Sequence, residues 1–365
     1  MPSVDIIIYI GGQNTLRFIF KISLIVISLL VSTALFIYWW MHAPIFNKST
    51  IRPTQTLELV VPPGSSAIVV GRKLHELGAS TGPELFSLAS RIAGVHKSLK
   101  AGVYSLSPKT SLASILARIS AGDSLHASIT LIEGWTFEQV MTEIHKHPHI
   151  KKSLSTNNIS SLSESLASSL GVLTKSMEGW IYPDTYFFQY GASDQQLLKR
   201  AVWLQKKSLD NAWEKRSKYS KLNSPIEALN LASIIEKETQ YEPDRKMVSG
   251  VFHNRLAMNM RLQSDPTIIY GLGSKFDGNL RRKHLKTDSS YNSYMRVGLP
   301  PTPISNPGRL ALLAAVNPAK TKALYFVAKG DGTSFFSQNF QQHKRAVNYY
   351  QRGIGSPPGQ KIRFE

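Results

Sequence analysis

The chain has 365 residues, and its 43 Lys and Arg against 24 Asp and Glu give a formal net charge of +19 at pH 7. It contains no cysteine, which excludes a disulfide scaffold, a Cys-ligated zinc site, an iron–sulfur cluster and a thiol nucleophile. Hydrophobic residues make up 42%, enough for a folded core. The charge predicts attraction to a polyanion: nucleic acid, anionic lipid or an anionic cell-wall polymer.

An uncharged segment near the N-terminus, residues 22–41, reads ISLIVISLLVSTALFIYWWM. At ~1.5 Å per residue such a helix spans ~30 Å, the thickness of a bilayer core. Tyr38, Trp39 and Trp40 stand where an aromatic belt belongs. A cleaved signal peptide is the alternative, but bulky residues occupy the place of its small-residue cleavage site. The sequence therefore predicts a transmembrane helix at 18–41.

Basic residues on both sides of this helix bear on its orientation. Arg17 and Lys21 lie at one end, while Lys48 and Arg52 lie further from the other. Because cytoplasmic flanks carry the excess of Lys and Arg, residues 1–17 are expected in the cytoplasm. The rest of the chain then lies outside it.

Two blocks follow a polar, Pro-containing stretch at 42–56, which is typical of a tether. The first block, 57–126, shows the order strand, helix, helix, strand, helix, which predicts a small α+β module. Its expected elements are a strand at 57–61, helices at 66–77 and 83–93, a strand at 102–106 and a helix at 111–122.

The second block, 127–350, predicts a larger mixed α+β domain. Serine-dense residues 153–169 are expected to form a loop or a weakly packed insertion, and 351–365 a flexible tail. The expected elements are strands at 128–133 and 182–188, helices starting at 136, 194 and 224, and a hairpin at 324–328 and 334–337.

The helix from Ser224 carries a candidate catalytic acid. Ser224 is a cap, Pro225 fits the first helical position, and Glu227 completes the start signal. Apolar residues cover most of the helix, so Glu236 is expected to be desolvated. Desolvation raises a carboxyl pKa and suits the group to general-acid catalysis. Glu238 points about 160° away around the helix.

An ordinary salt bridge is the competing interpretation of the same glutamates. Arg245, Arg255 and Arg261 follow within a short distance in the chain and offer partners for either of them. Residue pattern alone leaves this alternative open.

Six runs of sequence resemble one family. They are EGWIYPDTYFF, LASIIEKET, VFHNRL, RLQSDPTIIYGLG, YNSYMRVGLPPTPISNPG and ALYFV. They are similar to the endolytic murein transglycosylases, the MltG or YceG-like family, and the resemblance extends over roughly 57–350. The 57–126 module, which contains KAGVY, is similar to that family's LysM-like peptidoglycan-binding part. The resemblance therefore implies an α+β fold with a single N-terminal transmembrane helix, a LysM-like module and a catalytic domain at 127–350.

The resemblance implies a catalytic glutamate in the IIEKE segment, which by position is Glu236. It implies that Glu236 protonates the oxygen linking MurNAc to GlcNAc, and then acts as a base on the C6 hydroxyl of the same sugar to close a 1,6-anhydro ring. A conventional glycosidase needs two carboxyl groups, and no partner stands at an evident spacing. The candidate substrate-binding residues are Gln263, Asp265, Thr267, Tyr270, Tyr291, Asn292, Glu238 and Tyr186.

The same resemblance predicts partners and location. The expected partners are peptidoglycan glycan strands, membrane lipid through 18–41 and peptidoglycan synthases, with a role in terminating nascent strands. The expected location is the plasma (inner) membrane, with the catalytic domain outside the cytoplasm. No cofactor is expected, and no metal, because His145, His147 and His149 lack a matching acidic ligand set. No nucleic-acid motif accompanies the charge.

Two other function classes stay open. One is an inactive peptidoglycan-binding scaffold of cell-wall synthesis. The other is a small-molecule lyase of the aminodeoxychorismate type. A pyridoxal enzyme would need a Schiff-base lysine and a phosphate cradle, and neither is evident.

Overall fold

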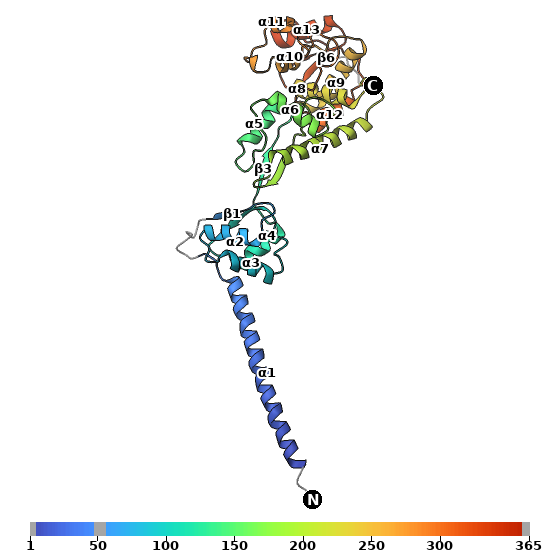
Figure 1. Cartoon of the computed structure of the whole chain (residues 1–365). Helices are drawn as coiled ribbons and strands as arrows, with labels where there is room; N and C mark the ends of the chain where they lie inside the picture. The colour runs from blue at the N-terminus through green and yellow to red at the C-terminus, as the bar shows by residue number, and fades with distance from the viewer. Residues whose placement is uncertain (1–4, 47–55, 360–365) are drawn as a thin grey trace. The chain divides into compact units, whose positions relative to one another are not determined.

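A computed structural model describes residues 5–46 and 56–359, with side chains from Arg17 onward. The predicted tether at 42–56 therefore lies largely outside the described residues. The chain forms two compact units, one of Met1–His126 with Gln189–Gly191 and one of Ala127–Phe188 with Ala192–Glu365 (Figure 1). Helices and short antiparallel strands occur in both units, so the predicted mixed α+β class is confirmed.

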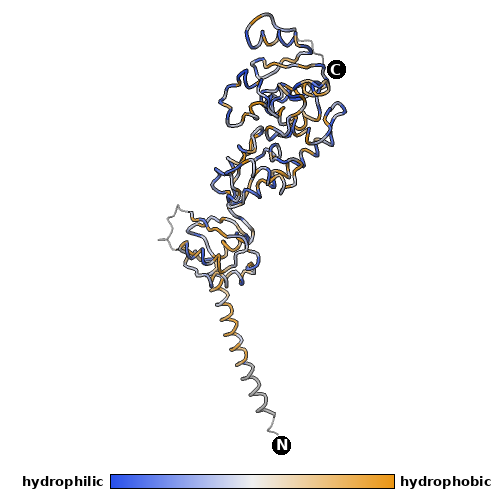
Figure 2. The backbone as a smooth tube through the Cα atoms, turned by 45° about the horizontal axis from the view of Figure 1, so that its top comes forward, coloured by the Kyte–Doolittle hydropathy of each residue, from blue (hydrophilic) through white to orange (hydrophobic). Residues whose placement is uncertain are grey.

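The first helix, α1 (Asp5–His42), contains the predicted apolar segment. Within Arg17–His42, the most apolar stretch of 18 residues has a mean hydropathy of 2.3 and is not buried by the protein. Figure 2 shows this run of apolar residues leading up to the first unit's fold. By length and composition this helix is able to cross a bilayer.

The rest of the first unit packs three helices against a two-stranded sheet. In that antiparallel sheet Leu57 pairs with Leu106 and Val61 with Gly102. Phe86, Tyr104 and other apolar side chains fill the core. The elements are β1 (Leu57–Val61), α2 (Ala67–Glu76), α3 (Pro83–Ile92), β2 (Gly102–Leu106) and α4 (Leu112–Ala121).

The chain after α1 joins this core at once, which corrects the predicted tether. Ile45 and Phe46 are buried, and the Ile45 amide donates to the Thr110 carbonyl at 2.9 Å. The Ser80 amide donates to the Ile45 carbonyl at 2.7 Å. Apolar side chains at these two positions outweigh the polar composition of the stretch around them.

The second unit is built around α8, whose residues from Ala228 to Glu236 are all buried. The helices α7, α9 and α12 pack against it, and the β5–β6 hairpin is confirmed with Tyr325 opposite Ser337. The elements are β3 (His126–Thr130), α5 (Phe137–Lys146), α6 (Ile159–Ser169), β4 (Thr185–Gln189), α7 (Asp194–Glu214), α8 (Pro225–Glu238), α9 (Glu242–Ala257), α10 (Asp265–Leu272), η1 (Gly273–Lys275), α11 (Arg282–Lys286), α12 (Arg309–Val316), β5 (Tyr325–Ala328), β6 (Ser334–Ser337) and α13 (Phe340–Arg352).

The prediction of a loop or weakly packed insertion at 153–169 is wrong, because α6 occupies its second half. Asn158 caps the helix by accepting the Ser161 amide at 3.0 Å. Leu166 is buried, and the Ser163 hydroxyl accepts the Met177 amide at 2.8 Å. The apolar residues of α6 have helical spacing, but the many serines between them obscure this pattern in the sequence.

The predicted tail at 351–365 also begins too early, since α13 continues to Arg352 and ends with Gly353 in a left-handed conformation. Residues 360–365 lie outside the described part of the chain.

Candidate active site

The start of α8 is the one its sequence predicts. The Ser224 hydroxyl accepts the Glu227 amide at 3.2 Å, and Pro225 occupies the first turn. The helix therefore begins at a fixed residue. Its last turn carries Glu236 and Glu238 to opposite sides, where they have different partners.

Glu236 is buried, with 8% of its surface exposed. Its Oε1 accepts a hydrogen bond from Arg245 Nη2 at 2.9 Å, and its Oε2 accepts the Gly308 amide at 2.9 Å. Arg245 lies in α9, and Gly308 is the residue before α12. The side chain is thus both a buried carboxyl group and one half of an ion pair, so both interpretations of the sequence apply.

These surroundings act on the pKa of Glu236 in opposite directions. Burial raises the pKa, and this effect outweighs the Gly308 amide and the Arg245 guanidinium, both of which lower it. The nearby Glu133 carboxylate raises it further. The carboxyl group is therefore held closer to neutrality than an exposed glutamate, while both oxygens already have donors for the charged form.

The Glu133 side chain packs directly over the Gly308 backbone. A Cβ atom there would lie 1.8 Å from Glu133 Oε1, so no other residue fits without displacing Glu133. Glu133 Oε2 is 4.0 Å from Arg245 Nη2, and this side chain is 47% exposed. Arg245 therefore faces two carboxylates, one buried and one reaching solvent.

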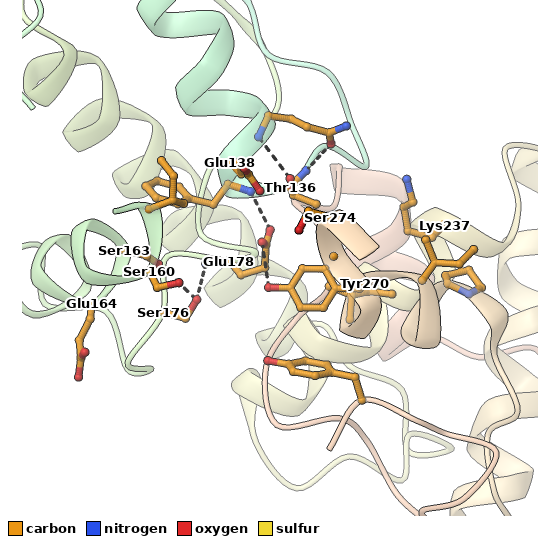
Figure 3. A pocket seen from close by; sticks show the side chains of 18 of the residues that line it. Thr136, Glu138, Ser160, Ser163, Glu164, Ser176, Glu178, Lys237, Tyr270 and Ser274 are labelled. Atoms are coloured by element: carbon orange, nitrogen blue, oxygen red, sulfur yellow. Dashed lines mark hydrogen bonds between the residues drawn. The ribbon is translucent and has the colours of Figure 1, made fainter. Parts of the chain in front are cut away.

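A cavity of about 1030 Å³, lined by both polar and apolar side chains, lies along the same part of the second unit (Figure 3). Lys237, the residue after Glu236, lines it, and its ammonium group donates to the Gly134 carbonyl at 3.3 Å. Tyr270 and Tyr291 form an aromatic wall, with ring centroids 5.0 Å apart. Such faces suit stacking against a sugar ring.

A second buried carboxyl group, Glu178, lines this cavity. Its Oε1 accepts the Phe137 amide at 3.0 Å, and its Oε2 lies 3.2 Å from the Tyr270 hydroxyl (Figure 3). Burial raises the pKa of Glu178 to about 8, although both hydrogen bonds lower it. Glu178 is not among the site residues predicted from the sequence, and its burial favours the protonated form.

One feature of the sequence could have drawn attention to Glu178. The tripeptide Glu-Gly-Trp occurs twice, at 133–135 and at 178–180. Asn306 joins the two copies. Its side chain donates to the Trp135 carbonyl at 2.9 Å and accepts the Ile181 amide at 2.9 Å. The Asn306 carbonyl also accepts the Gly134 amide at 2.9 Å.

The predicted substrate-binding residues fall into separate groups. Tyr270 and Tyr291 line the cavity. Gln263 and Asp265 are exposed: Gln263 has a positive φ of 51°, and Asp265 accepts a hydrogen bond from the Tyr294 hydroxyl at 2.7 Å. A positive φ is uncommon for a residue other than glycine.

Glu238 belongs to a different environment from Glu236. It is half-buried and accepts a hydrogen bond from the Ser264 hydroxyl. Burial raises the pKa of Glu238 to about 7, the Asp265 charge raises it further, and the Ser264 and Arg255 side chains lower it. Among the described residues, Glu236 and Glu238 thus share no hydrogen-bond partner.

Three predicted substrate-binding residues require correction, because they lie in the interior. Thr267 and Asn292 have at most 1% of their surface exposed, as does Tyr186. Thr267 donates to the Ser264 carbonyl, Asn292 to the Thr287 carbonyl and Tyr186 to the Tyr182 carbonyl. These side chains hold the surrounding backbone and present no surface to a glycan.

The side chains of His145, His147 and His149 contact neighbouring side chains. His145 Nε2 lies 3.7 Å from Asp194, and the His147 ring meets Phe188 edge-on at 5.2 Å. Across residues 5–46 and 56–359, the structure contains no group of three or more His, Asp or Glu side chains placed to hold a metal ion.

Comparison with known proteins relates this chain to one family. The model of the YceG-like family matches residues 59–349. The "Endolytic murein transglycosylase" of Bacillus subtilis is 30% identical over 324 residues, which cover 84% of this chain and 89% of the relative. The protein of the same name from Streptococcus pneumoniae (strain D39) is 28% identical over 318 residues, covering 79% of this chain and 57% of that longer relative.

A crystal structure of a YceG-like protein from Listeria monocytogenes matches with a TM-score of 0.52 and 31% identity, covering 79% of this chain and 98% of that one. The fold and site define a two-unit α+β protein with a buried carboxyl group, Glu236, next in the chain to a residue that lines a large cavity. The chain belongs to the YceG-like family.

Proposed function

We propose that this chain is a membrane-anchored endolytic lytic transglycosylase that cleaves MurNAc-β-1,4-GlcNAc bonds within peptidoglycan. The observation that carries the proposal is the Glu236 carboxyl group, buried between the Arg245 guanidinium and the Gly308 amide. The name shared by the curated relatives supplies the substrate class.

The first chemical step uses the protonated form of Glu236, which burial favours. Glu236 gives its proton to the oxygen that joins C1 of MurNAc to C4 of GlcNAc. The C1–oxygen bond breaks, and GlcNAc leaves with a new hydroxyl group.

In the second step the C6 hydroxyl oxygen of the same MurNAc bonds to C1, and its proton passes to the Glu236 carboxylate. No water is consumed, because the substrate supplies its own nucleophile. Between the two steps Arg245 and the Gly308 amide stabilise the carboxylate. One carboxyl group therefore acts first as acid and then as base.

The cavity beside Lys237 is the proposed glycan cleft. Tyr270 and Tyr291 offer ring faces for the sugars, and Gln263 and Asp265 are the proposed polar contacts outside the cavity. A volume of about 1030 Å³ is large for a single monosaccharide and suits a chain cleaved internally.

The remaining parts receive roles that fit this activity. We assign α1 as a single-pass anchor of the plasma (inner) membrane with a cytoplasmic N-terminus, 57–126 as a LysM-like peptidoglycan-binding module, and 127–350 as the catalytic domain. Placed there, the enzyme would terminate nascent glycan strands beside peptidoglycan synthases.

The test is digestion of purified peptidoglycan by the full-length protein, with the products separated and weighed. Wild type is expected to yield 1,6-anhydroMurNAc ends, which are one water lighter than hydrolysis products. Glu236→Gln is expected to fold and to lose cleavage, because an amide cannot give up a proton in this way. Glu214→Gln, at an exposed residue of α7, is the matched control and should keep full activity.

Full cleavage by Glu236→Gln would remove Glu236 from the mechanism. Products with ordinary reducing ends would replace the lyase by a hydrolase. Glycan binding with no product from wild type would favour the inactive scaffold.

A further inference from the structure

An apolar stripe runs along the exposed side of α3 in the first unit. Leu85, Leu88 and Ile92 are 47%, 49% and 49% exposed, and their spacing of three and four residues places them on one face. Phe86 and Ala89 on the other face are fully buried in the unit's core. These three side chains, the α3 stripe, are not needed for the fold of the module.

The start of α3 is tied to the end of α1. Ile45, three residues after α1 ends, has a carbonyl that accepts both the amide and the hydroxyl group of Ser80. Phe46 and Ala79 form an isolated antiparallel β-bridge beside this contact. At ~3.3 Å per residue, Ile45 lies within ~10 Å of the last residue of α1, and Ser80, which is hydrogen-bonded to Ile45, is three residues before the start of α3.

The last turns of α1 indicate where along the chain the membrane–water interface lies. Tyr38 and Trp39 are 65% and 64% exposed and suit the interfacial belt, while Met41 is already part of the unit's core. The headgroup layer adds roughly 5–8 Å on each side of the hydrocarbon. On the proposed anchor the unit begins at the interfacial layer, and the segment that leads into α3 is hydrogen-bonded to the first residues after α1.

The charges around the α3 stripe suit an anionic lipid surface. Arg91 in its last turn and Lys97 just beyond are exposed, and Glu84 is the one acidic residue of the helix. An aliphatic face flanked by basic residues is the pattern of helices that lie in the membrane interface. It contains no aromatic ring for stacking on sugars.

We propose that the α3 stripe lies in the interfacial layer of the bilayer that α1 spans, so that the module is held against the membrane at two places. This inference rests on the proposed membrane anchor. The contact would fix the module's orientation and leave its other faces free for the cell wall.

The absence of native cysteine allows one label at a chosen site in the full-length chain. Leu88→Cys carries a fluorophore on the stripe. Ala121→Cys carries it at the exposed end of α4 opposite Ser111, the residue bridged to Pro44. Each protein is reconstituted at one chain per nanodisc of anionic phospholipid with brominated acyl chains, which quench a fluorophore that touches them.

The label at position 88 is expected to be quenched roughly twofold or more relative to the label at 121. Adding Leu85→Gln and Ile92→Gln to the Leu88→Cys protein should remove that difference. The matched control is Leu173→Gln with Met258→Gln, two exposed apolar residues of the other unit, and it should leave the quenching unchanged.

Equal quenching at 88 and 121 in protein that is inserted in nanodiscs would overturn the inference and leave the anchor intact. Failure of the chain to insert at all would instead reject the anchor. A spectral shift at 88 that appears only with two chains per nanodisc would assign the stripe to a second copy, which also overturns the membrane contact.

Discussion

Arg245 and Glu236 form a buried ion pair, with Nη2 and Oε1 2.9 Å apart and side-chain exposures of 8% and 5%. Nε and Nη1 of the same guanidinium have no hydrogen-bond partner among the residues that the structure describes. Arg245 therefore uses only part of its hydrogen-bonding capacity in this pair, and its positive charge favours the ionised form of Glu236. Arg245 lowers the pKa of Glu236 against the larger effect of burial.

Replacing Arg245 by methionine is expected to raise the pKa of Glu236. The alkaline limb of the pH–activity profile reports loss of the proton from a general acid, so it should move to higher pH. Cleavage at neutral pH should nevertheless fall, by roughly tenfold or more, because the carboxylate between the two steps loses a charge-assisted hydrogen bond. The measurement is the rate of anhydro-end formation between pH 5 and 9.

Arg345→Met, at an exposed residue of α13, is the control and should leave the profile in place. A limb that moves to lower pH in Arg245→Met would contradict the role given to Arg245.

Glu178→Gln is expected to stabilise the protein at alkaline pH. The ordinary pKa is 4.5 and the folded one about 8, so between these values the folded state keeps a proton that the unfolded state has lost. The unfolding free energy of wild type therefore decreases as pH rises through this window, by about 1.4 kcal/mol per unit of pKa difference. Glutamine resembles the protonated form and removes this slope.

The measurement is denaturant unfolding at pH 5 and pH 9, with Glu164→Gln, at an exposed residue lining the same cavity, as the control. Equal slopes for Glu178→Gln and wild type would show that Glu178 is ionised in the folded protein. The Tyr270 hydroxyl group lies 3.2 Å from Glu178 Oε2, so Tyr270 should also sense the loss of the Glu178 proton.

The sequence predicts the bounds of α8 and the burial of Glu236 well, because the patterns that indicate them are local. Ser224, Pro225 and Glu227 mark where the helix begins, and its apolar residues predict that it is buried. The mixed fold class and the β5–β6 hairpin follow from similarly short patterns. The Gly308 amide that binds Glu236 is 72 residues away, and no local pattern predicts such a contact.

Glu178 shows the opposite case. Its burial depends on the Phe137 amide and on Tyr270, which come from separate parts of the chain. The same holds for Thr267, whose motif suggested a sugar contact although the fold turns its hydroxyl group inward. Motifs therefore indicated a candidate region, and packing decided which side chains line the cavity there.

Ser264→Ala is expected to raise the pKa of Glu238 above about 7, because the Ser264 hydroxyl group favours the charged carboxylate. A hydrogen bond to a charged group corresponds to a change of roughly one unit. The measurement is the titration of the Glu238 carboxyl carbon by NMR, assigned with Glu238→Gln. Ser120→Ala, whose hydroxyl group donates to the Ala117 carbonyl, is the control. An unchanged titration would mean that Ser264 does not bind the charged form.

Asn306→Ala tests whether the two Glu-Gly-Trp segments depend on one side chain. The substitution leaves the buried Ile181 amide without its acceptor and removes one of the two donors to the Trp135 carbonyl. An unsatisfied buried amide costs about 1–3 kcal/mol, so the unfolding free energy should fall by at least that amount. Asn211→Ala is the control: it also loses a bond to a backbone carbonyl, but on the exposed side of α7, and should change stability by less than about 0.5 kcal/mol.

Because the Gly134 backbone lies against Glu236 and Glu178 precedes Ile181 in the chain, glycan cleavage should fall even under conditions where Asn306→Ala is fully folded. Unfolding curves and cleavage rates on the same preparations separate the two effects, and wild-type activity in the folded variant would limit Asn306 to a purely structural role.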